Sequence, residues 1–101
     1  MSDKGYTAKC WGLRIMGLSP FMKLDDFLGM VDHASGLEEG EAAVLKANAY
    51  IKFSRYDDAF REFQAALGGK SEYSRMEAKA MIDRWPTFMA GRARAAGRRK
   101  K

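Results

Sequence analysis

The 101-residue sequence contains little cysteine, histidine and proline: one, one and two residues, respectively. A single cysteine, Cys10, cannot form an intramolecular disulfide bond, which excludes a disulfide-stabilised secreted domain and favours a reducing compartment, the cytoplasm or an organelle matrix. Cys10 and His33 provide too few soft ligands for an ordinary structural zinc site, so we expect no bound metal. No apolar run approaches the roughly 20 residues that cross a bilayer, so a transmembrane segment is excluded.

The sequence also lacks the motifs of several large enzyme classes, since it has no P-loop, no GxGxxG and no HExxH. We interpret Cys10 as a small hydrophobic residue, with a reactive thiol as the alternative, and His33 as a surface or helix-capping residue. The adjacent pairs Asp25-Asp26 and Asp57-Asp58 diverge by about 100° around a helix, which suits helix starts and not paired acid–base carboxylates. We therefore expect no catalytic residue, no cofactor and no enzymatic activity.

Positive charge is concentrated at the C-terminus. The chain carries 18 basic and 13 acidic residues, a formal charge of +5, and residues 91–101 hold six of the basic residues and no acidic one. These six residues are Arg92, Arg94, Arg98, Arg99, Lys100 and Lys101. We expect this tail to be extended or partly helical and to dock electrostatically on nucleic acid, an acidic protein face or an anionic membrane surface. The alternative is a solvated terminus that aids solubility. Because the tail has no aromatic residue, it is not suited to sequence-specific recognition of single strands.

The spacing of apolar residues predicts an all-α chain of four to five helices, because no segment alternates with the period of two that a strand requires. Residues 1–19, which include three glycines, are expected to form a short helix or an extended arm. The helices are expected over residues 20–34, starting at Ser19-Pro20, over 37–53, over 55–67, from Ser71 to an interruption at Trp85-Pro86, and briefly from Thr87. The expected organisation is an N-terminal arm over 1–19, a helical domain over 20–90 and a basic tail over 91–101.

The clearest pattern lies in residues 40–73, which predict two antiparallel helices joined by about two residues. Small residues at three helical positions would let the helices approach closely, and aromatic residues beside them would fill the gaps. These residues are Ala47, Ala59 and Ala66, with Tyr50, Tyr56 and Phe63. The pattern resembles the tetratricopeptide repeat, a helix–turn–helix of 34 residues. The alternative is a plain helical hairpin within a small bundle.

The resemblance to the tetratricopeptide repeat implies a groove along the first helix of the repeat that binds a peptide or another protein. By position, the groove would be lined by Glu41, Val44, Asn48, Ile51 and Lys52. Asn48 stands where many such repeats bind a peptide backbone or carboxylate, whereas the lysine that accompanies it one turn earlier is Val44 here.

The function that we expect from the sequence is a non-enzymatic protein–protein interaction module, an adaptor or accessory subunit of a larger assembly whose basic tail docks electrostatically. The alternatives are a nucleic-acid-associated subunit, bound to a ribonucleoprotein or ribosome, and a small phage-type inhibitor. Trp11, Phe53, Trp85 and Phe88 are candidate apolar anchors for a partner, unless they are buried within the domain. The seven methionines are expected to fill the core, or otherwise to provide a pliable contact surface.

Overall fold

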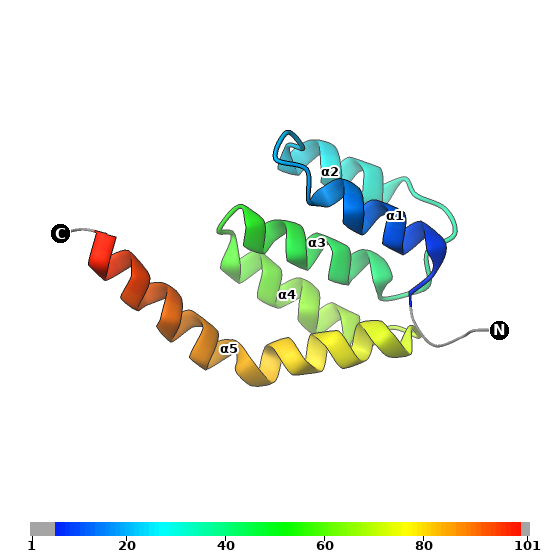
Figure 1. Ribbon diagram of the computed structural model, residues 1–101. Coiled ribbons are helices and arrows are strands. Elements are labelled where there is room, and N and C mark those ends of the chain that lie inside the picture. The colour runs from blue at the N-terminus through cyan, green and yellow to red at the C-terminus, as the bar shows by residue number, and fades with distance from the viewer. Residues whose placement is uncertain (1–5, 100–101) are drawn as a thin grey trace.

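The computed structural model describes residues 6–99, with side chains through residue 93. All regular structure in this part of the chain is α-helical, which confirms the prediction of an all-α fold. The five helices are α1 (Ala8–Gly17), α2 (Leu24–Asp32), α3 (Glu41–Lys52), α4 (Tyr56–Ala66) and α5 (Glu72–Arg99) (Figure 1). None of the helices in the described part of the chain is both long and apolar enough to cross a membrane.

The helices are arranged in three successive layers. α1 and α2 lie together at the top of Figure 1, α3 and α4 form the middle layer, and α5 runs along the bottom. α3 is the central helix, because it packs against each of the other four, while α4 packs against α3 and α5. The order of the layers follows the order of the chain, so each pair of helices covers the next.

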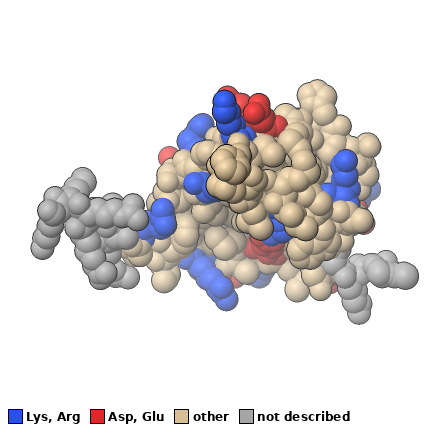
Figure 2. Space-filling model, turned by 45° about the horizontal axis from the view of Figure 1, so that its top comes forward, with Lys and Arg blue, Asp and Glu red and all other residues tan. Residues whose placement is uncertain are grey.

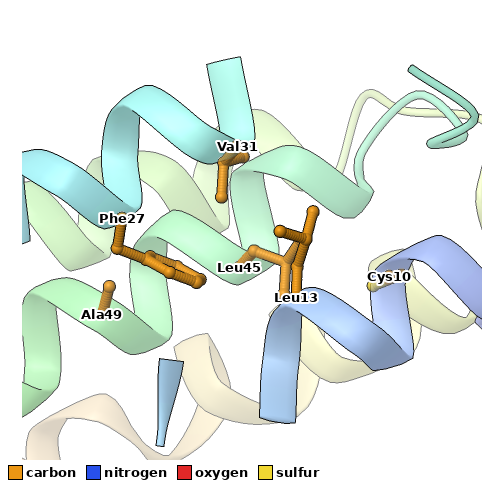
Figure 3. Close-up of a cluster of buried hydrophobic side chains, with 6 residues drawn as sticks. All are labelled: Cys10, Leu13, Phe27, Val31, Leu45 and Ala49. Atoms are coloured by element: carbon orange, nitrogen blue, oxygen red, sulfur yellow. The ribbon is translucent and has the colours of Figure 1, made fainter. Parts of the chain in front are cut away.

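Two clusters of buried side chains hold these layers together. The first joins α1, α2 and α3 and consists of Cys10, Leu13, Phe27, Val31, Leu45 and Ala49 (Figure 3). The second joins α3, α4 and α5 and consists of Val44, Ala47, Ala59, Phe63, Ala66 and Ala78. The alanines at positions 47, 59 and 66 are fully buried, as their spacing predicts, and their small size lets α3 and α4 approach closely.

Residues 1–19 were expected to form either a short helix or an extended arm, and the structure has the short helix α1. The Thr7 hydroxyl caps its N-terminus by accepting a hydrogen bond from the Cys10 backbone N–H at 3.2 Å. Cys10 and Leu13 then enter the first buried cluster. α1 is therefore part of the folded domain and not an appendage to it.

The prediction that a helix starts at Ser19-Pro20 is wrong, because α2 begins at Leu24. The Ser19 hydroxyl accepts a hydrogen bond from the Phe21 N–H at 3.2 Å, which forms a turn around the proline. The Ser19 carbonyl accepts a second bond from Lys52 Nζ at 2.6 Å. This contact with α3 ties the turn to the body of the protein, so a tertiary interaction overrides the local helix-start signal.

The prediction that Trp85-Pro86 interrupts a helix is also wrong, because α5 continues through Pro86. Proline removes one backbone hydrogen bond from a helix, but packing on both sides of it compensates here. The centroid of the Trp85 ring lies 5.3 Å from that of Phe60 on α4, and the centroid of the Phe88 ring lies 5.8 Å from that of Tyr56 on α4. These contacts hold both halves of α5 against the body, and the helix bends without breaking (Figure 1).

The C-terminal segment was expected to be extended or partly helical, and the structure has the helix, since α5 runs to Arg99. Residues 90–99 consist only of alanine, glycine and arginine. Alanine and arginine are strong helix formers, and positive charge near the C-terminus of a helix interacts favourably with the helix dipole. Both effects favour the helical backbone.

None of the six methionines in the described part of the chain is fully buried, but Met22 and Met30 pack against the first cluster and Met81 packs against the second. Met16 and Met76 are exposed, so the prediction of a core role is wrong for these two. The interior is built from smaller side chains, mainly alanine, valine and leucine, around Phe27 and Phe63.

Candidate functional site

Two of the five residues expected to line a groove lie inside the protein. Glu41 and Val44 are fully buried, so the prediction of an open groove is wrong at these positions. The Glu41 carboxylate accepts hydrogen bonds from the backbone N–H groups of Thr7 and Glu38 and from the Thr7 hydroxyl, each at 2.8 Å. The N-terminus of α1 therefore covers the start of α3.

The other three predicted residues, Asn48, Ile51 and Lys52, line a pocket of about 600 Å³ between α1, α2 and α3. The pocket is also lined by Arg14, Gly17, Leu18, Phe27, Leu45 and Ala49. Its walls are mostly apolar, with a few polar side chains, and its volume is that of an ordinary small-ligand or side-chain site.

Two of the polar residues of the pocket are engaged within the protein. Lys52 Nζ donates hydrogen bonds to the carbonyls of Gly17 at 2.9 Å and Ser19 at 2.6 Å, which satisfies the C-terminal end of α1. Asn48 Nδ2 donates to the Val44 carbonyl at 3.0 Å and to the Glu77 carboxylate at 3.0 Å. The role of Asn48 in this structure is therefore to join α3 to α5.

Glu77 is the centre of a polar cluster that connects three helices. Its carboxylate accepts hydrogen bonds from the Tyr6 hydroxyl, from Asn48 Nδ2 and from the Arg14 guanidinium, the last at 2.9 Å and also an ion pair. Sequence reasoning missed Arg14 and Glu77, because 63 residues separate them and no local pattern connects them.

The electrostatics of this cluster favour the charged carboxylate. Burial raises the pKa of Glu77, but the hydrogen bonds from Tyr6, Asn48 and Arg14 outweigh burial, so the net pKa lies below its ordinary value of 4.5. Burial and the hydrogen bond to Glu77 raise the pKa of the Tyr6 phenol, which therefore stays protonated as a donor. Burial lowers the pKa of Arg14, but the hydrogen bond to Glu77 and the charge of Glu77 raise it by more. The net pKa of Arg14 therefore lies above its ordinary value.

The variant Glu77→Gln is expected to lower the free energy of unfolding at neutral pH by about 1 to 2 kcal/mol, because the amide loses the charge-assisted bonds from Arg14 and Tyr6. A carboxyl group with a lowered folded-state pKa stabilises the protein above its ordinary pKa, and this contribution is lost as the pH falls. The difference between wild type and variant should therefore shrink when urea unfolding is measured below pH 4.5.

The exposed residue Glu39 provides the control for this measurement. Glu39→Gln removes the same charge and should change the stability by less than about 0.5 kcal/mol at either pH. A difference between Glu77→Gln and wild type that stays constant from pH 7 to pH 3 would contradict the assignment of the acid-sensitive stability to Glu77.

Cys10 does not have the surroundings of a reactive thiol. It is fully buried, and burial together with the charge of Glu41 raises the pKa of the thiol to about 12. Reactive cysteines are accessible and have a lowered pKa, so the structure favours the small hydrophobic role. His33 lies at the exposed C-terminus of α2, where its Nδ1 is 2.9 Å from the Gly29 carbonyl oxygen. Among the described residues, no three histidine, cysteine or acidic side chains are grouped as a metal site would require.

Four exposed apolar residues lie on the outer side of α1 and on the turn that follows it. Trp11, Ile15, Leu18 and Phe21 are 48%, 65%, 75% and 89% exposed, and we call these four residues the α1 surface. The first three are spaced by four and three residues, so they form one stripe of the helix. Leu18 also lines the pocket, so the α1 surface and the pocket are continuous. Figure 2 turns the side of α1 and α2 toward the viewer, and most of this face is uncharged.

The candidate anchors at the other positions are less accessible. Phe53 is exposed at the C-terminal end of α3, whereas Trp85 and Phe88 are partly buried between α4 and α5. The signal that identifies the α1 surface was present in the sequence as the spacing of Trp11, Ile15 and Leu18. It becomes informative only once residues 8–17 are known to be helical.

Four of the six predicted docking residues of the tail lie at the end of α5. The Arg92 side chain is exposed, and its guanidinium lies 5.4 Å from the centroid of the Tyr56 ring. Arg94, Arg98 and Arg99 belong to the helical backbone of α5. The side chains of these three arginines, and the whole of Lys100 and Lys101, lie outside the described part of the structure.

Comparison with known proteins does not assign the chain to a family, because no family model, no curated protein and no solved structure matches it.

Proposed function

We propose that this protein is a non-enzymatic protein–protein interaction module, an adaptor or accessory subunit of a larger assembly, that binds its partner through the α1 surface. The observation that carries this proposal is the exposure of Trp11, Ile15, Leu18 and Phe21. Exposed apolar residues that form a contiguous patch are typical of interaction sites, whereas isolated ones are ordinary. The patch combines a tryptophan anchor with a neighbouring pocket, as binding hot spots commonly do.

The composition around the α1 surface indicates the chemistry of the partner. Residues 6–24 contain no acidic residue, and the exposed Lys23 follows Phe21 by two residues. An apolar patch with a basic residue beside it and no acidic one is complementary to an apolar segment flanked by aspartate or glutamate. We therefore propose an amphipathic, acidic protein segment as the partner.

The tetratricopeptide-like interpretation of α3 and α4 remains part of this proposal. It is supported by the buried alanines between the two helices and by the packing of α3 against both α1 and α5. In tetratricopeptide arrays the first helices of each pair provide the binding surface, and the pocket that α1 and α3 line together with Phe27 of α2 supports this interpretation.

The test is a double variant of two exposed residues, Leu18→Ser with Phe21→Ser. Because neither side chain is buried, the variant should keep the circular dichroism spectrum and the unfolding midpoint of the wild type. A partner that co-purifies with the wild-type protein in a fixed ratio should be identified, prepared separately and titrated against both proteins. We expect binding to the double variant to be weaker by at least about tenfold.

A control is Leu67→Ser, which removes one exposed apolar side chain at the end of α4, away from the α1 surface. This variant should bind the partner as the wild type does. Equal binding by wild type and the double variant, or equal weakening by the control, would place the interface elsewhere. Self-association of the purified wild type that the double variant lacks would assign the α1 surface to a homodimer and overturn the proposal of a different partner.

A further inference from the structure

The C-terminal part of the chain has a charge composition that differs from the rest of the molecule. Asp83 is the last acidic residue, and residues 84–101 contain seven arginine and lysine residues. Among the described side chains, the ion pair nearest the C-terminus is Lys79 with Asp83 at 3.3 Å. No acidic residue within the segment is therefore available to neutralise this charge.

The same part of the chain leaves the body of the protein. The side chains that pack α5 against α3 and α4 lie in its first two thirds, and Met81, Ile82 and Trp85 are the last that join the second cluster. Figure 1 shows the red end of α5 extending beyond α3 and α4 on the side opposite to the N-terminus. Arg92 still contacts Tyr56, and Ala93 beyond it is exposed. A helix end without a packing surface of its own contributes little to folding.

We propose that the C-terminal end of α5 binds the phosphate backbone of double-stranded nucleic acid without reading its sequence. Four arginines between positions 92 and 99 occupy about 10 Å of helix axis, a charge density of the same order as that of duplex DNA. All four basic residues within residues 90–99 are arginine, whose planar guanidinium forms paired hydrogen bonds with phosphate oxygens. An α-helix also fits the width of the DNA major groove.

The composition of the segment disfavours the other anionic surfaces. Residues 90–99 contain only alanine, glycine and arginine, so the helix has no large apolar face to insert into a membrane. No aromatic residue follows Phe88, so the segment cannot stack on the bases of a single strand. The segment can therefore recognise a partner only through its shape and charge. Among anionic partners, duplex phosphate offers the densest regular array of negative charge.

This inference rests on residues that are separate from the α1 surface, so either can fail without the other. The test compares the full-length protein with a variant in which glutamine, also a good helix former, replaces four arginines. The substitutions are Arg92→Gln, Arg94→Gln, Arg98→Gln and Arg99→Gln. The matched control removes the same number of charges from exposed lysines of the body, with Lys9→Gln, Lys23→Gln, Lys70→Gln and Lys79→Gln.

Binding is measured by fluorescence anisotropy with a mixed-sequence duplex. We expect the wild type to lose about a hundredfold in affinity between 50 and 200 mM salt, as four neutralised phosphates require. At the lower salt concentration the arginine variant should bind at least about thirtyfold more weakly than wild type, while the lysine control stays within about threefold. Similar affinities for two unrelated duplex sequences would support contact with the backbone.

The probes also separate the possible sources of phosphate. The affinities for duplex DNA and duplex RNA are compared. Tighter binding to one of them identifies which duplex supplies the phosphate, and either result agrees with the proposal. Tighter binding to polyglutamate, to phosphatidylserine vesicles or to single strands than to duplexes would overturn it. Equal losses in the arginine variant and the lysine control would also overturn it, because they would indicate an effect of net charge alone.

Discussion

Replacing Glu41 by alanine is expected to lower the free energy of unfolding by about 3 to 4 kcal/mol. The carboxylate is fully buried and accepts three hydrogen bonds, two of them from the backbone N–H groups of Thr7 and Glu38. Alanine would leave these donors without a partner and create a cavity between α1 and α3. Urea unfolding followed by circular dichroism measures the loss.

Glutamine is not a conservative replacement at this position. Both carboxylate oxygens of Glu41 face a backbone N–H donor, so the amide NH₂ group would meet a donor in either orientation. We therefore expect Glu41→Gln to destabilise by about 2 kcal/mol and not to restore the wild-type stability. The exposed neighbour provides the control, since Glu39→Ala should change the stability by less than about 0.5 kcal/mol. If Glu41→Ala unfolds at the urea concentration of the wild type, the carboxylate does not hold α1 in place.

The fold could be predicted from the sequence where local preference and packing agree. The helical spacing of apolar residues identified α3 and α4 to within a few residues, and the buried alanines were identified from the same pattern. The predicted helix boundaries were wrong where a contact between residues far apart in the sequence changed the local structure. Lys52 draws Ser19 into a turn, and the aromatic contacts of Trp85 keep α5 continuous through Pro86.

The candidate site was less accessible to sequence reasoning than the fold. Positional analogy placed Glu41 and Val44 on an open groove, but the N-terminus of α1 covers Glu41, and Val44 is buried in the second cluster between α3, α4 and α5. The bonds that close this groove join Thr7 to Glu41 and Arg14 to Glu77, across 34 and 63 residues. Neither pair has a spacing that could be recognised without the tertiary structure. The three groove residues that do reach the pocket lie one to two turns further along α3.

The turn between α4 and α5 is expected to be as sensitive as Glu41. A Cβ atom at Gly69 would lie 2.5 Å from the Glu39 carbonyl oxygen and 2.7 Å from Gly40 Cα, both of them backbone atoms. Gly40 has a left-handed φ of 105°, so it cannot move aside without strain. The Ser71 N–H donates to the same Glu39 carbonyl at 3.0 Å, which joins the turn to the start of α3.

Gly69→Ala is therefore expected to lower the free energy of unfolding by about 3 kcal/mol, because the two backbone segments must separate and the bond from Ser71 is lost. The matched control is Gly12→Ala on α1, where a Cβ meets no atom within 4 Å. An alanine within a helix is favoured over glycine, so this variant should be more stable than wild type by about 0.5 to 1 kcal/mol. If urea unfolding shows that Gly69→Ala lowers the free energy of unfolding and Gly12→Ala raises it, the loss at Gly69 comes from the close approach of the two segments and not from alanine itself. A Gly69→Ala protein as stable as wild type would mean that the turn does not rest on Glu39 and Gly40, and that α5 is positioned by the second buried cluster alone.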